Sequence, residues 1–167
     1  MKILLMLVSL YMQDAGVSHS FSEDDLVCAT LNTWHEARGE DELGRLYVGQ
    51  TVRNRLLRDE YPDTICGVVY AKGAFEWTED NVPDSPHITS IEQVELMIDT
   101  IRITASALDG KHDGVIMGAT DYFAHKQVTP CWEPSFEKRF VYGNHTWMFD
   151  RNEKTPCWDR LKLAQNP

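Results

Sequence analysis

The 167-residue sequence is poor in basic residues: it has 16 Lys and Arg against 26 Asp and Glu, for a net charge of −10. A protein that binds nucleic acid presents a basic face to the phosphate backbone, so this balance argues against a nucleic-acid partner. The same charge disfavours adhesion to an anionic membrane surface. Uncharged glycan chains remain compatible partners.

Several common catalytic signatures are also missing. His35-Glu36 begins like the zinc motif H-E-x-x-H, but Gly39 stands where the second histidine would be. There is no G-x-S-x-G nucleophile motif, no phosphate-cradling glycine loop, and no C-x-x-C or C-x-x-H pair. We therefore predict no metal, no cofactor and no covalent nucleophile.

The chain has only four cysteines: Cys28, Cys66, Cys131 and Cys157. In an oxidising compartment they could form two disulfides, in any of three pairings. Cys28 falls on an apolar helix face, where a small buried thiol is an equal alternative. We expect any disulfide to involve Cys131 or Cys157, in the loop-rich C-terminal part.

The apolar run from Ile3 to Met12 follows Lys2 and leaves two alternatives open. Its length is typical of a signal-peptide core and too short to span a bilayer, and Ser18 and Ser20 could precede a cleavage point. The run could equally be an element packed on the domain or an anchor to a partner. We favour retention of residues 1–20.

Helix signals dominate the sequence from Phe21 to Gly110. Ser22 and Asp25 form a capping box for a helix that runs to Gly39, and a second helix is expected over residues 42–58. Ser90 and Gln93 form another box, and its helix has the expected buried stripe Val94, Ile98, Ile101, Ala105 and Leu108.

Beyond these helices the spacing of hydrophobic residues shortens from the helical period toward the two-residue period of strands. Residues 65–70 form a short apolar turn, and residues 72–86 read as a loop carrying Phe75 and Trp77. Strands are expected over 120–124 and in a hairpin over 140–147 about Gly143-Asn144. The sequence thus predicts one α+β domain over residues 21–150, with a helical N-terminal half, a small C-terminal sheet, and a tail over 151–167.

The densest cluster of chemically active side chains lies at the end of the first predicted helix. Glu36 follows Trp34 there, and an aromatic neighbour that excludes water favours a protonated carboxylic acid. Cleavage of a glycosidic bond needs such an acid to protonate the leaving oxygen. Taken alone, residues 34–40 are equally compatible with a helix end whose charged side chains are simply solvated.

The order of motifs along the whole chain adds specificity. Glu36-Ala37-Arg38-Gly39-Glu40 is followed by characteristic segments at 49–55, 61–70, 73–77, 107–110, 121–123 and 143–147. This succession, over residues 24–149, resembles the SleB-type cell wall hydrolases, a family of spore cortex-lytic enzymes that also occurs in phages and Gram-negative bacteria. Trp34-His35 departs from the commoner aromatic-Gly pair, and Pro130-Cys131-Trp132 has no counterpart that we can assign.

The resemblance implies a small lysozyme-related fold and a peptidoglycan lytic transglycosylase. Such an enzyme cleaves between N-acetylmuramic acid and N-acetylglucosamine and leaves a 1,6-anhydro end, with Glu36 as its single catalytic acid/base. It would act at the bacterial cell wall as a metal-free monomer, for example as a phage lysin or in a virion. The alternatives are a hydrolytic muramidase, whose second carboxylate would be Glu76, Glu79 or Asp121, and a non-catalytic glycan-binding or virion structural protein.

The same resemblance suggests substrate-binding positions, each with a structural alternative. Glu40 could support the site, cap a helix or pair with Arg38. Gln50 and Asn54 could bind N-acetyl groups or link their helix to the hairpin. The remaining candidates are aromatic or strand residues expected to line the same groove: Phe75 and Trp77 as a loop platform, with Tyr122 and His145.

Overall fold

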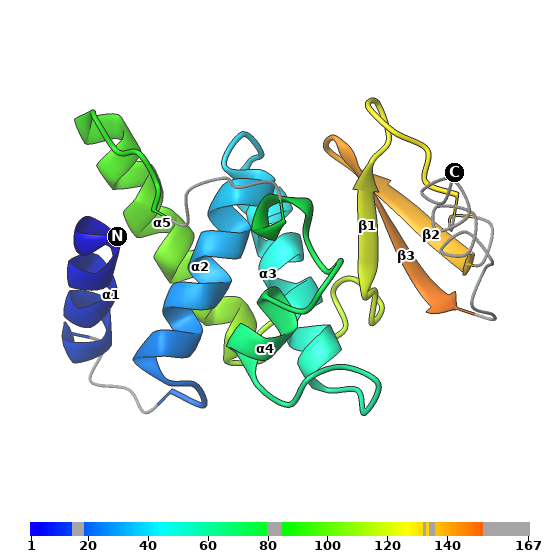
Figure 1. Ribbon diagram of the computed structural model, residues 1–167, viewed down its shortest axis with the longest axis horizontal. Helices are drawn as coiled ribbons and strands as arrows, with labels where there is room; N and C mark the ends of the chain where they lie inside the picture. The colour runs from blue at the N-terminus through cyan, green and yellow to red at the C-terminus, as the bar shows by residue number, and fades with distance from the viewer. Residues whose placement is uncertain (15–18, 80–84, 132, 134–135, 152–167) are drawn as a thin grey trace, which may run out of the picture. The chain divides into compact units, whose positions relative to one another are not determined.

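The computed structural model describes residues 1–14, 19–79, 85–131, 133 and 136–151. They fall into two compact units, residues 1–116 and 117–167. The first unit holds α1 (Lys2–Asp14), α2 (Glu23–Ala37), α3 (Glu42–Leu56), α4 (Ile65–Val69), the 3-10 turn η1 (Glu76–Thr78) and α5 (Ile91–Leu108) (Figure 1). The second holds β1 (Asp121–Ala124), β2 (Phe136–Tyr142) and β3 (His145–Arg151). The predicted order of helices followed by a small sheet is confirmed, and the predicted tail from residue 152 lies outside the described residues.

The first of the long predicted helices, α2, begins at its predicted cap. The Asp25 amide donates to Ser22 Oγ at 3.1 Å and the Ser22 amide donates back to Asp25 Oδ2 at 3.1 Å, so the capping box is complete. Glu23 and Asp24 occupy the same first turn, where a negative charge is favourable next to the positive end of the helix dipole.

Helix α2 is the centre of the first unit, since it contacts α1, α3, α4 and α5. Its apolar side chains Leu26, Ala29, Leu31 and Trp34 are all buried. Where α2, α3 and α5 meet, the side chains are small. A Cβ on Gly49 of α3 would come within 3.2 Å of Ala107 Cβ on α5, and the hydroxyls of Thr33 and Thr104 lie 3.2 Å apart. These small residues let three helices approach closely.

Helix α5 departs from its prediction in two details. Ser90 caps it, but the Gln93 side chain accepts from the amide of Thr89 and not from Ser90, so the predicted box is only half formed. Ile98, expected in the buried stripe, is 48% exposed, while its neighbour Met97 is fully buried. The helix ends before Gly110, whose φ of +75° suits a residue without a side chain.

The N-terminal apolar run forms α1, which packs against α2 and α5 and buries Leu4 and Val8 completely. The alternative of a packed element is therefore what the structure shows, while removal of residues 1–20 stays untested. Among the described residues, no helix has the length and apolar character needed to cross a membrane.

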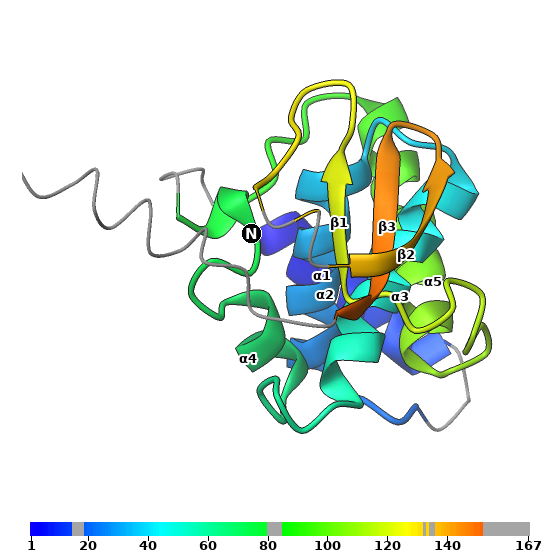
Figure 2. The same ribbon diagram turned by 90° about the vertical axis from the view of Figure 1, so that its right-hand side faces the viewer.

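The second unit is a three-stranded antiparallel sheet in the order β1-β3-β2, with β3 in the middle (Figure 2). The predicted hairpin is confirmed: Tyr142 pairs with His145 across a two-residue turn. Gly143 has a φ of +57° there, as the first central residue of a type II′ turn requires. Trp147, in the middle strand, is fully buried.

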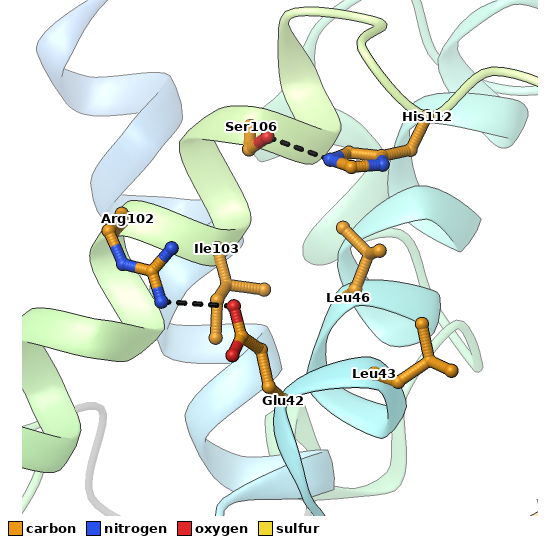
Figure 3. Close-up of a pocket in the computed structure, with 7 residues that line it drawn as sticks. All are labelled: Glu42, Leu43, Leu46, Arg102, Ile103, Ser106 and His112. Carbon is orange, nitrogen blue, oxygen red and sulfur yellow. Dashed lines mark hydrogen bonds and ion pairs between the residues drawn. The ribbon is translucent and has the colours of Figure 1, made fainter.

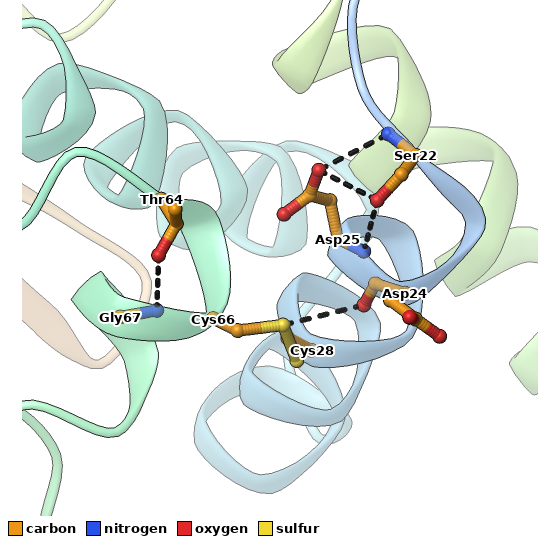
Figure 4. Close-up of a disulfide and its surroundings, with 7 residues drawn as sticks. All are labelled: Ser22, Asp24, Asp25, Cys28, Thr64, Cys66 and Gly67. Atoms are coloured by element: carbon orange, nitrogen blue, oxygen red, sulfur yellow. Dashed lines mark hydrogen bonds between the residues drawn. A yellow bond between two sulfur atoms is a disulfide. The ribbon is translucent and has the colours of Figure 1, made fainter.

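A disulfide joins Cys28 of α2 to Cys66 of α4 (Figure 4). The alternative of a buried free thiol at Cys28 is therefore wrong, because α4 packs against α2 and brings the two cysteines together. Cys131 is also disulfide-bonded, while Cys157 lies outside the described residues.

Arg53 fastens α3 to the end of α5 and the turn beyond it. Its guanidinium donates to Asp113 Oδ1 at 2.6 Å, to Asp113 Oδ2 at 2.9 Å and to the carbonyl of Leu108 at 2.8 Å. The hydrogen bond from Arg53 holds the pKa of Asp113 below its ordinary value, and the same bond raises the pKa of Arg53.

Replacing Cys28 and Cys66 by serine should lower the unfolding temperature by roughly 10 °C. Closing a 38-residue loop stabilises the fold by about 4 kcal/mol in the chain-entropy account, most of it through the unfolded chain. Differential scanning calorimetry would measure the change, and a reducing agent should lower the unfolding temperature of the wild type by more than that of the variant, which keeps the disulfide of Cys131. Equal unfolding temperatures in the two proteins would contradict a stabilising role for this bond.

The Arg53–Asp113 pair should stabilise the protein at neutral pH and stop doing so in acid. Because the folded pKa of Asp113 is depressed, its contribution is complete above the ordinary carboxyl range and is lost as pH falls through the folded value. Asp113 is half exposed, so Asp113→Asn should cost no more than about 1 kcal/mol at pH 7. Thermal unfolding from pH 7 to pH 3 should show the two proteins converging, and a constant difference would refute this.

Candidate functional site

Glu36 lies in the last turn of α2, where the helix is held firmly on both sides of it. Trp34 and Ala37 are buried, with exposed fractions of 4% and 1%, while Glu36 itself is only partly buried. The amide of Arg38 donates to the Trp34 carbonyl at 3.2 Å and ends the helix. A carboxyl is thus fixed near the surface by a backbone that cannot easily shift.

Trp77 from η1 covers one face of this helix end. Its ring stacks on His35 with centroids 4.4 Å apart and an interplanar angle of 14°, and its Nε1 donates to the buried Asn32 Oδ1 at 3.0 Å. Phe75 is buried beneath the guanidinium of Arg55 at 4.7 Å. The loop buries both rings, at 5% and 6% exposure, so they belong to the core more than the sequence predicted, and a substrate-binding role for them stays a prediction.

The second glutamate of the motif, Glu40, lies in the short connection between α2 and α3 and is partly buried. Its main-chain carbonyl accepts from Arg45 Nη1 at 2.8 Å. The N-cap of α3 is its neighbour Asp41, which accepts from the amide of Gly44 at 2.9 Å. The N-cap of α3 is thus Asp41, one residue after Glu40, and a role of Glu40 in the site stays a prediction.

Gln50 and Asn54 lie on one stripe of α3 and are both buried. Gln50 Nε2 donates to Asn54 Oδ1 at 3.3 Å and to Asp113 Oδ1 at 3.1 Å. The structure therefore links this stripe to the turn after α5, while a link from these amides to the hairpin stays a prediction. Binding of N-acetyl groups by these two amides remains a prediction.

Tyr122 and His145 come together in the second unit. Their rings lie 5.3 Å apart, edge to face, and both contact the ring of Trp147, at 5.7 Å and 5.4 Å. Phe140 stacks on the same tryptophan at 5.5 Å. The sheet thus gathers these residues into one aromatic cluster around Trp147.

The three suggested second carboxylates have different surroundings. Glu76 is exposed, and the Glu79 carboxylate accepts from the amide of Gly73 at 2.6 Å. Asp121, in the second unit, accepts from the Thr120 hydroxyl at 2.8 Å. Among the described residues, no group of three His, Cys, Asp or Glu side chains could hold a metal ion.

A cavity of about 410 Å³ lies beside the end of α2 that carries Glu36. Its lining combines that helix end with the segment before α5 and the first turns of α5: Trp34, His35, Arg38, Ser85, Pro86, His87, Gln93 and Leu96. The sequence reasoning missed this cavity, because nothing in the local pattern of residues 85–87 indicates that they lie against α2.

A second cavity of about 360 Å³ lies between α3 and α5 (Figure 3). Its polar groups already bond to each other: Arg102 pairs with Glu42 at 3.0 Å, and the Ser106 hydroxyl is 2.9 Å from His112 Nε2. Its charged side chains are therefore already paired, whereas Arg38 in the cavity at the end of α2 has no ion-pair partner among the described residues.

Comparison with known proteins identifies the fold and the family. Residues 39–148 match the model of the cell wall hydrolase family, a match that begins just after Glu36. The catalytic domain of the SleB protein of Bacillus cereus has a TM-score of 0.59 over 80% of this chain and 95% of its own, at 22% identity. The catalytic domain of the germination-specific lytic transglycosylase SleB from Bacillus anthracis has a TM-score of 0.62 over 80% of this chain and 100% of its own, also at 22% identity.

Curated relatives agree with this result. A spore cortex-lytic enzyme of Halalkalibacterium halodurans is 28% identical over 70% of this chain, and one of Bacillus cereus is 29% identical over 39%. The chain spans only 32% and 25% of the length of these two proteins. With a family match over most of its length and the fold of the SleB catalytic domain, the chain belongs to the cell wall hydrolase family.

Proposed function

We propose that this chain is a peptidoglycan lytic transglycosylase that cleaves between N-acetylmuramic acid and N-acetylglucosamine, with Glu36 as its acid and base. Membership of the cell wall hydrolase family supports a wall substrate. The reaction type is supported by the similar fold of the Bacillus anthracis protein, which is itself described as a lytic transglycosylase.

The position of Glu36 carries the proposal. It is a partly exposed carboxyl in the last turn of the central helix, between the buried Trp34 and Ala37 and beside the stacked rings of His35 and Trp77. The C-terminal end of a helix is its negative end, so it favours the neutral acid over the carboxylate. A general acid must hold its proton until the leaving oxygen needs it, and this environment helps it to do so.

The reaction needs a single carboxyl. The acid form of Glu36 donates its proton to the glycosidic oxygen, and the bond from that oxygen to C1 of the muramic sugar breaks. The resulting carboxylate then takes the proton from the C6 hydroxyl of the same sugar, and O6 bonds to C1 to close the anhydro ring. No water enters the products, so no second carboxylate is required to position water.

A hydrolytic muramidase with the same Glu36 is the alternative. It would need a second carboxylate to activate water or to stabilise the cation. Of the suggested groups in the first unit, Glu79 is engaged by the Gly73 amide and Glu76 is exposed. We therefore favour the intramolecular route. A phage or virion setting stays a prediction.

Glu36→Gln should reduce the release of soluble fragments from purified peptidoglycan by roughly a hundredfold or more, because the amide cannot donate the proton. A dye-release assay on labelled walls would measure the rate, and circular dichroism would check the fold. Glu95→Gln, which changes an exposed glutamate of α5, is the matched control and should keep the wild-type rate.

Glu40→Gln separates the two glutamates of the motif. If Glu40→Gln abolished release while Glu36→Gln kept the wild-type rate, the catalytic role would move to Glu40. The assignment of Glu36 would then be wrong.

A further inference from the structure

We propose that the cavity beside the end of α2 binds the acidic peptide that branches from the muramic sugar, with Arg38 as its principal contact. This inference rests on the proposed function and adds a second recognition site to it. The cavity is lined by Trp34, His35, Arg38, Ser85, Pro86, His87, Gln93 and Leu96 and has a volume of about 410 Å³.

The chemistry of the lining favours an anion. Arg38 is positively charged, and His35 and His87 contribute imidazole nitrogens that can form hydrogen bonds. The described lining residues include no acid, although the whole protein carries a net charge of −10. A local cationic lining in an acidic protein discriminates in favour of a carboxylate ligand.

The side chain of Arg38 has no ion-pair partner among the residues that the structure describes. It is exposed at the C-terminus of α2. Other arginines nearby in sequence are engaged: Arg45 donates to the Glu40 carbonyl, and Arg53 binds Asp113. A planar guanidinium with its donors unused is suited to bidentate binding of a carboxylate.

The other lining residues suit a peptide. Trp34, Pro86 and Leu96 supply apolar surface, while Ser85 and Gln93 supply polar groups. The Gln93 carbonyl oxygen is taken by the Thr89 amide at 2.7 Å, which leaves the Gln93 amide nitrogen to donate to a peptide carbonyl. A mixture of apolar surface and a few fixed polar groups is typical of small-ligand pockets.

The position of the cavity suits the peptide branch of the muramic sugar better than the glycan chain itself. Glu36 follows Trp34 by two residues, which turns it about 200° around the helix axis. It therefore faces away from the side of α2 that Trp34 and Arg38 present to the cavity. The two sides of a helix are about 10 Å apart, a distance that about three extended residues cover. A peptide on a sugar held at Glu36 thus has the length to reach Arg38 around the end of the helix.

The test compares purified peptidoglycan with the same glycan strands stripped of peptides by an amidase. The ratio of kcat/KM on intact strands to kcat/KM on stripped strands measures the preference for peptide. We expect the wild type to prefer intact strands, and Arg38→Gln to lower that ratio about five- to tenfold through KM. Arg58→Gln, which changes an arginine paired with Glu60 at 3.6 Å, should keep the wild-type ratio.

Two results would overturn the proposal: a wild type without preference for peptide-bearing strands, or an Arg38→Gln variant with the wild-type ratio. If Arg38→Gln failed to fold, His87→Gln, on an exposed loop position, should lower the ratio in the same direction. An unchanged ratio in that variant would also contradict the proposal.

Failure of the proposed function would look different, because the wild type would then release no fragments from either substrate. In that case the cavity is tested by titrating Glu36→Gln with the free wall peptide and following the amide resonances. Shifts concentrated at Arg38, His87 and Gln93 would support the site, and the absence of shifts there would overturn it.

Discussion

The burial of α2 is the constraint on which the rest of the first unit depends. This helix contacts every other α-helix of the unit and is tied to α4 by the Cys28–Cys66 bond. Such contacts are possible because Gly49 and the threonines at the α2–α3–α5 junction occupy little space. A close-packed interior resists small displacements of any one helix. The backbone that carries Glu36 is therefore held in place by the packing of the whole unit.

A single buried hydrogen bond connects that helix to the loop that covers it. Asn32 is fully buried, and leaving its side-chain oxygen without a hydrogen bond would cost about 1–3 kcal/mol. Trp77 Nε1 donates to it at 3.0 Å, and the same indole stacks on His35. Trp77 thus holds in place His35, the neighbour of Glu36, and Glu36 itself is only partly buried.

Local chemistry made much of the fold predictable. Ser22 with Asp25 and the Gly143-Asn144 turn each specify a structure within a few residues, and both are confirmed. Predictions failed where contacts distant in sequence decide the outcome. Met97 replaces Ile98 in the core, and Trp77 is buried because Asn32, far earlier in the chain, offers its ring an acceptor. The cavity at Arg38 could not be predicted from the sequence for the same reason, since only the tertiary fold brings residues 85–87 next to α2.

Mass spectrometry of the released fragments is the direct test of whether Glu36 cleaves a glycosidic bond without adding water. Purified peptidoglycan would be digested with the wild type and with Glu36→Gln, and the masses of the muropeptides would be measured. We expect muropeptides one water lighter than their hydrated forms, with anhydro ends, from the wild type alone. Hydrated, reducing ends from the wild type would contradict it and would require a second carboxylate that activates water.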